Sequence, residues 1–186
     1  MTVERETLET FLKTLLQPEL FDDYCPNGLQ IVGKSTLKKV LFAVSATRES
    51  ALYAEKIKAD ALIVHHGLFW KFHGTKTLTG AFYKRVAPLL KNDINLLGYH
   101  LPLDAHPEVG NAKALATLLE MGELKPFGAY KGATTGLMGS LPFALDGSEL
   151  KTILETKLSH SVLYSNPIEG KKIKTIGIIT GGANSE

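Results

Sequence analysis

Three short apolar runs constrain the fold of this chain more than any other feature of its sequence. They cover residues 38–44, 61–64 and 94–99, and each has the length and continuity of a buried strand. Two segments whose residues favour helix, 47–58 and 77–91, lie between them. Strands that alternate with helices at this spacing are joined by right-handed crossovers in a largely parallel sheet. The pattern therefore predicts an α/β fold.

Local signals set the boundaries of the predicted helices. Apolar residues recur at helical spacing over 5–17, and Pro18 ends that helix. Thr47 is suited to cap the helix over 47–58. Pro88 lies inside the segment 77–91, where it predicts a break or a kink.

A second α/β unit is predicted after the first. A helix over 111–121 is followed by residues 122–136, which are rich in Gly, Lys and Pro and lack apolar periodicity. We interpret this segment as the join between two sheet-and-helix units, residues 1–124 and 125–186. The second unit is predicted to contain a strand near 135–141, a helix over 147–158 opened by Asp146 or Ser148, and strands near 161–165 and 173–180.

The C-terminal residues predict that the second unit is incomplete. The strand at 173–180 runs into two glycines, and these are followed by Asn184, Ser185 and Glu186, which are residue types that begin helices. No helical segment follows them. We therefore expect that the helix covering the last strand is missing from this chain.

Composition and charge narrow the partners and the compartment. The net charge is +2 and the lysines are scattered, which argues against a nucleic-acid-binding surface. The N-terminal residues do not form a signal peptide, and no apolar run approaches the roughly 20 residues needed to span a bilayer. Cys25 is the single cysteine, so an internal disulfide is excluded, as expected in a reducing compartment. These features predict a cytoplasmic protein with no membrane contact, and they argue against a nucleic-acid partner.

The histidines carry the clearest chemical signal. His65 and His66 are adjacent at the end of the second predicted strand, and Gly67 permits the chain to turn there. Asp104 follows the end of the third predicted strand, and neighbouring strand ends lie within about 5 Å. His100 and His106 flank Asp104 in the sequence. Diverging imidazoles with a carboxylate between them can hold two ions about 3.5–4 Å apart, so the sequence predicts a metal site at this edge of the sheet.

These residues also have structural interpretations. A histidine pair at a strand end commonly caps or hydrogen-bonds the backbone. Trp70 and Phe69, close to the pair in sequence, either stack on a planar substrate or wall the pocket. Tyr24 and Asn27 either line the same cleft or form a turn.

Three segments resemble signature sequences of the NIF-three-like family, whose members are also called type-two GTP cyclohydrolase I homologues. They are residues 24–33, 59–70 and 92–112, in the family's order and at its spacing. Residues 125–128 and 177–182 also match in place. The resemblance therefore covers nearly the whole chain, and the His-His-Gly and His-Leu-Pro-Leu-Asp segments are its most specific parts.

The resemblance implies a dinuclear metal centre in which His65, His66 and Asp104 are ligands. The family completes that centre with a later His-x-x-x-Glu pair, which this sequence does not contain. The resemblance therefore also implies that a C-terminal segment is absent. In addition, it implies a ring-shaped homo-oligomer, commonly a hexamer, with its sites facing an inner cavity.

Three functions remain open at this point. The first is a metal-dependent hydrolase acting on a nucleotide or related small molecule, with His100 as general base or as a group that orients Asp104. The second is a non-catalytic metal-binding protein, and the third is a ring that engages other proteins or nucleic acid. Mixed imidazole and carboxylate ligands suit Zn, Fe, Mn or Co. The family name suggests ring opening of GTP, but no guanine-reading motif is present.

Overall fold

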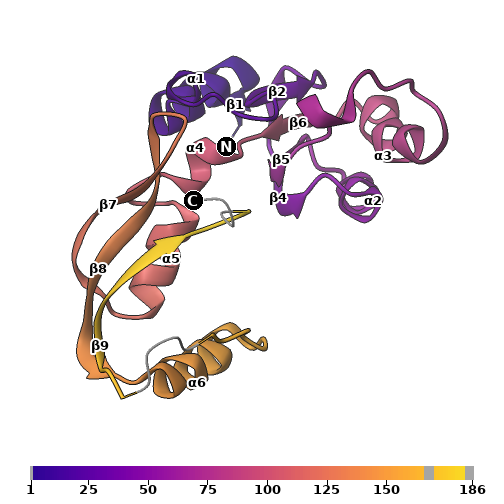
Figure 1. Cartoon of the computed structure of the whole chain (residues 1–186). Helices are drawn as coiled ribbons and strands as arrows, with labels where there is room; N and C mark the ends of the chain where they lie inside the picture. Colours follow the sequence, from indigo (N-terminus) through magenta and orange to yellow (C-terminus); the bar gives the residue numbers. More distant parts are fainter. Residues whose placement is uncertain (1, 166–169, 183–186) are drawn as a thin grey trace. The chain divides into compact units, whose positions relative to one another are not determined.

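The computed structural model describes residues 2–165 and 170–182 of the chain (Figure 1). The chain divides into two compact units, Met1–Leu103 and Asp104–Glu186. Each unit has its own sheet and its own apolar core. The observed division thus falls earlier in the chain than the boundary that composition predicts after residue 124.

The first unit is built on a four-stranded sheet with the order β2-β6-β5-β4 (Figure 1). Strands β4 (Val40–Ser45), β5 (Ala61–His66) and β6 (Asn95–Gly98) are parallel, as the sequence predicts. Strand β2 (Gly28–Ile31) pairs antiparallel with β6 and is not predicted. It follows a turn-rich segment and is only four residues long, so it lacks a periodic signal.

Alternate residues of β5 pack against helices on opposite faces of the sheet. Leu62 and Val64 join a core with helices α2 (Arg48–Lys56) and α3 (Gly80–Lys91). Ala61 and Ile63 join a second core with helix α1 (Arg5–Leu16). The two-residue side-chain period of a strand produces this division. The short remaining elements of this unit are β1 (Val3–Glu4), β3 (Thr36–Leu37) and the 3₁₀ turns η1 (Pro18–Leu20) and η2 (Lys71–His73).

Strand β4 is less buried than its apolar sequence predicts. Leu41 and Ala43 pack against the first core, but Phe42 and Val44 are 72% and 70% exposed. β4 is the last strand in the sheet order, and the α1-side core takes only Val40 from it. The prediction of a strand is confirmed, and the prediction that both of its faces are buried is wrong.

The second unit contains a three-stranded antiparallel sheet with the order β7-β8-β9. Its elements are α4 (Leu101–Asp104), which begins in the first unit, α5 (Asn111–Leu118), β7 (Gly122–Tyr130), β8 (Ala133–Leu145), α6 (Gly147–Leu158) and β9 (Ile173–Ile179). Ala116, Leu137 and Ile178 are buried in its apolar core. The predicted helix over 147–158 is confirmed, with Asp146 as its N-cap.

The segment 122–136, predicted to be a join, is instead most of a β-hairpin. Tyr130 pairs with Ala133, so Lys131 and Gly132 form a two-residue loop, and both have positive φ. This is the geometry that matches the twist of paired strands. β7 is mostly exposed, so its sequence shows no apolar alternation. Residues 161–165 are not a strand, and the helix start predicted at 184–186 lies outside the described residues.

None of the helices in the described part of the chain has both the length and the apolar character needed to cross a membrane.

Candidate metal centre

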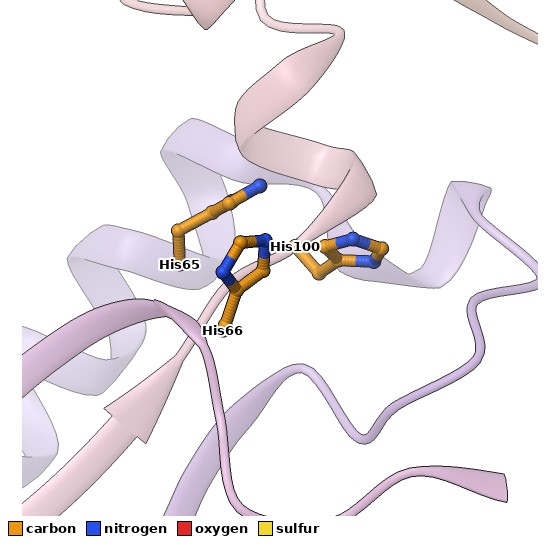
Figure 2. A group of neighbouring side chains, drawn as sticks. All are labelled: His65, His66 and His100. Atoms are coloured by element: carbon orange, nitrogen blue, oxygen red, sulfur yellow. The ribbon is translucent and has the colours of Figure 1, made fainter. Parts of the chain in front are cut away.

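The sheet of the first unit brings three histidines together at one edge. His65 and His66 are the last two residues of β5, and His100 follows the adjacent strand β6. Because β5 and β6 are parallel neighbours, their carboxyl ends meet at the same edge. Figure 2 shows the three imidazoles gathered there. A ligand nitrogen from each lies within 4.8 Å of the others, and all three residues are half-buried.

The rings lie close enough to surround a single small volume. The ring centroid of His65 lies 4.5 Å from that of His66 and 4.9 Å from that of His100, and the third pair is 5.8 Å apart. In Figure 2 the His65 and His66 side chains rise from consecutive positions of one strand, and the His100 side chain comes from the neighbouring segment. The prediction that these strands end at the same edge of the sheet is confirmed, and the structure places His65, His66 and His100 together there.

Hydrogen bonds to the scaffold orient the paired histidines. His65 Nδ1 lies 3.0 Å from the carbonyl oxygen of Tyr99, which can only accept, so Nδ1 carries the proton. His66 Nδ1 lies 2.9 Å from Ser45 Oγ at the end of β4. For His65 this tautomer puts the ligand lone pair on Nε2, the usual arrangement of a metal-binding histidine.

Gly67 is needed for space rather than for an unusual backbone conformation. The residue has no positive φ. A Cβ at this position would overlap the side-chain amide of Gln30, whose Oε1 accepts a hydrogen bond from the Leu68 amide at 2.9 Å. The strand ends at His66, and Gly67 leaves it without a left-handed backbone, with the Gln30 amide filling the space beside it.

Asp23 is part of this edge and is not singled out by the sequence. It is 4% exposed, and its Oδ1 lies 2.8 Å from His100 Nδ1. Burial raises the pKa of Asp23, but hydrogen bonds from His100, Asn27 and Leu101 lower it more, to about 2. The signal that could have found it is its place directly before the family-like segment 24–33, among turn-forming residues.

Cys25 lies close to Asp23 and is buried. Burial, followed by the charge of Asp23 and a hydrogen bond to it, raises the pKa of the Cys25 thiol to about 12. A thiol that stays protonated is a poor nucleophile. Cys25 is therefore not a reactive thiol in this structure.

Asp104, predicted as a metal ligand, is the last residue of α4 and the first residue of the second unit. Its side chain is buried, and its Oδ1 accepts hydrogen bonds from Asn111 Nδ2 at 2.7 Å and from Thr180 Oγ1 at 2.9 Å. These partners belong to the second unit. The role of Asp104 as a ligand stays a prediction.

Trp70 forms a wall beside the histidines. Its ring meets the His100 ring edge-on at 5.0 Å and lies 6.0 Å from His66. The indole Nε1 donates to the Gly67 carbonyl oxygen at 3.1 Å, which fixes the ring. Phe69 instead packs edge-on against Phe82 of α3.

The donor set fits a divalent transition metal. Imidazole is a common ligand for Zn, Fe, Co and Cu, and two of the three rings are held with the proton on Nδ1 by acceptor-only groups. The remaining three histidines lie outside the cluster. His106 Nδ1 accepts hydrogen bonds from the amides of Glu108 and Val109, and His73 and His160 are exposed.

Fold and site together define an α/β protein with an imidazole-rich candidate metal centre at the carboxyl edge of its sheet.

Comparisons with known proteins identify the family. A family model described as Duf34/NIF3 (NGG1p interacting factor 3) matches residues 3–186. The chain is 40% identical over 178 residues to a "GTP cyclohydrolase 1 type 2 homolog" of Pasteurella multocida, covering 96% of this chain and 70% of that protein. It is 38% identical over 181 residues to the protein of the same description in Escherichia coli K12, with the same shares covered.

Two solved structures share the fold. One, described as "protein ybgI, unknown function", is 36% identical with a TM-score of 0.87, covering 97% of this chain and 70% of that one. TTHA1606 from Thermus thermophilus is 32% identical with a TM-score of 0.85, covering 97% of this chain and 72% of that one. The chain therefore belongs to the Duf34/NIF3 family and spans about 70% of the length of these relatives.

Proposed function

We propose that this protein binds a divalent transition metal through His65, His66 and His100, and that the bound ion serves hydrolysis of a small molecule. The observation that carries the proposal is the cluster of three imidazoles whose ligand nitrogens lie within 4.8 Å of one another. Such an ion supplies Lewis acidity that polarises a carbonyl or phosphoryl oxygen.

The chain's own residues support this use of the site. The Tyr99 carbonyl oxygen and the Asp23 carboxylate each hold one imidazole by Nδ1, which limits the reorganisation needed when a ligand binds. Trp70 offers a half-buried aromatic ring beside the cluster, and a planar base could pack against its exposed part. A nucleotide or a related heterocyclic compound is therefore the substrate class we propose.

The test of metal binding is elemental analysis of protein purified without chelators and then reconstituted with zinc. We expect bound metal in the wild type and its loss in the double variant His65→Ala/His66→Ala. His73→Ala is the matched control, because His73 is an exposed histidine outside the cluster. Metal content near zero after reconstitution, or equal content in the double variant, would contradict the proposal.

The roles of His100 and Asp104 can be separated in the same assay. If His100 is a ligand, His100→Ala should weaken zinc binding as strongly as the loss of His65 does. If Asp104 is the third ligand and His100 only supports it, Asp104→Asn should lose more metal, and His100→Ala should lose about 10- to 100-fold in affinity. The geometry of the first unit favours the first outcome.

Non-catalytic metal binding is the alternative function. A panel of nucleotides and phosphoesters, assayed with and without added zinc, manganese or cobalt, distinguishes the two. Turnover that depends on the metal and is absent in His65→Ala/His66→Ala supports the hydrolase. Metal binding without turnover on the whole panel favours a metal store, chaperone or regulator.

A further inference from the structure

The Asp23 carboxylate holds both the side chain and the backbone at the start of α4. Its Oδ1 accepts from His100 Nδ1 at 2.8 Å and from the Tyr24 amide at 2.6 Å. Its Oδ2 accepts from Asn27 Nδ2 and from the Leu101 amide, both at 2.9 Å. One buried side chain thus ties the loop before β2 to the imidazole of His100 and to the residue that follows it.

His100 itself is fixed from several directions. Asn27 Oδ1 accepts a hydrogen bond from the His100 backbone amide at 2.8 Å, and Asn27 in turn donates to Asp23. Trp70 meets the imidazole edge-on at 5.0 Å. Asp23 therefore restrains the imidazole ring of His100, and Asn27 restrains its backbone amide.

The carboxylate also selects the tautomer of the imidazole. An ionised carboxylate only accepts hydrogen bonds, so the nitrogen that faces it must carry the proton. Nδ1 of His100 is that nitrogen, and the lone pair of the neutral ring is consequently on Nε2. Carboxylates in this relation to a metal-binding histidine orient the ring and raise its basicity.

We propose that Asp23 is a positioning residue of the candidate metal centre, which holds His100 as the Nδ1-protonated tautomer with Nε2 presented as the ligand atom. The expected effect on metal binding rests on the proposed function. The tautomer of His100 does not, because it is a property of the metal-free protein.

A second ion held directly by Asp23, Cys25 and His100 is the competing interpretation, because their ligand atoms also lie within 4.8 Å of one another. The hydrogen bonds argue for positioning. Each oxygen of Asp23 already accepts two hydrogen bonds, one from a backbone amide and one from a side chain. The buried Cys25 thiol also forms a hydrogen bond with this carboxylate. An ion at this place would have to displace several of these donors.

The test combines nitrogen NMR with zinc titration. In metal-free wild type, at a pH where the imidazoles are neutral, ¹⁵N-labelled His100 should give the shifts of a protonated Nδ1 and an unprotonated Nε2. In Asp23→Asn, the amide can donate to Nδ1, so the equilibrium should move toward the tautomer protonated on Nε2, and zinc affinity should fall by about 10- to 100-fold. Asp22→Asn is the matched control, since Asp22 is an exposed neighbour whose Oδ1 lies 3.2 Å from Lys71 Nζ.

Each result bears on the proposal in a defined way. A His100 ring protonated on Nε2 in the wild type overturns it, and this measurement does not depend on the folding of any variant. Reduced zinc affinity in Asp23→Asn with an unchanged tautomer also overturns it, because the effect would then be merely structural. A second zinc equivalent that disappears in Cys25→Ser would make Asp23 a ligand instead. Failure of the wild type to bind zinc overturns the proposed function. The NMR shifts of metal-free His100 still test whether Asp23 sets its tautomer.

Discussion

The two ends of the first sheet both bury polar side chains, but they use them differently. At the amino ends, Asp60 accepts from Lys34 Nζ at 2.7 Å and from the amides of Lys38 and Lys39 at 2.9 Å. Asn95, fully buried, donates to the carbonyl oxygens of Lys34 and Asp60 and accepts from the Gly33 amide. These contacts join loops to strands.

At the carboxyl ends, by contrast, the buried polar group Asp23 holds a ligand-type side chain, His100, beside two other imidazoles. Both ends contain a buried carboxylate with a lowered pKa. Burial and a shifted pKa therefore do not by themselves mark a functional site. What separates the two ends is the set of three imidazoles whose ligand nitrogens converge at the carboxyl ends.

Removing Asp60 should give the largest loss of stability and no loss of metal. Asp60→Ala leaves two partly buried backbone amides and Lys34 without their acceptor, so the loss of three hydrogen bonds should lower the free energy of unfolding by about 3 kcal/mol. Urea denaturation measures this loss, and zinc titration under native conditions should give the wild-type affinity. A large drop in zinc affinity in a folded Asp60→Ala protein would break the distinction between the two ends.

Acid should weaken the carboxyl end through Asp23. The folded-state pKa is about 2, below the unfolded value of about 3.9, so the stabilisation is fully present above about pH 4 and is lost as the pH falls toward 2. The expected contribution is about 2 kcal/mol. Denaturant titrations across this range should show a steeper pH dependence for the wild type than for Asp23→Asn. Equal slopes would contradict the assignment of the hydrogen bonds around Asp23.

Thr47 should give the smallest effect, although it lies at the same end of the sheet as the histidines. It caps α2 by accepting from the Ser50 amide at 3.1 Å, and Ser50 Oγ lies 2.9 Å from the Thr47 amide in return. Thr47→Ala should lower the free energy of unfolding by about 1 kcal/mol. Zinc affinity should match the wild type. If Thr47→Ala lost zinc as the histidine variants do, zinc binding would depend on the general integrity of the carboxyl end and not on the three imidazoles.

The sequence predicted those parts of the fold whose signals are local. Strands β5 and β6 contain continuous apolar runs because both of their faces are covered. Helix α6 begins at a capping box that can be read directly from Asp146 and Glu149. The strand predicted near 135–141 lies within β8, but its hairpin partner β7 is not predicted, because β7 is largely exposed and therefore has no apolar pattern. The exposure of Phe42 and Val44 depends on which face α1 covers, and that is a tertiary property.

The same distinction holds for the candidate site. His65 and His66 could be found because they are adjacent at a strand end, and His100 because it follows the next strand. Asp23 could not be found in this way, since it is 77 residues from its partner His100 and lies in a segment that resembles an ordinary turn. Asp104 remains a predicted ligand that rests on sequence resemblance, and its observed partners Asn111 and Thr180 lie in the second unit.

The most direct test of the central claim is the X-ray absorption spectrum of the zinc-loaded protein. We predict a first shell of nitrogen and oxygen atoms with the multiple scattering of three imidazoles, from His65, His66 and His100. The double variant His65→Ala/His66→Ala, if it retains any zinc, should show at most one imidazole, whereas His73→Ala should match the wild type. A shell without imidazole scattering, or one that is unchanged in the double variant, would contradict the assignment of the metal centre to the carboxyl end of the sheet.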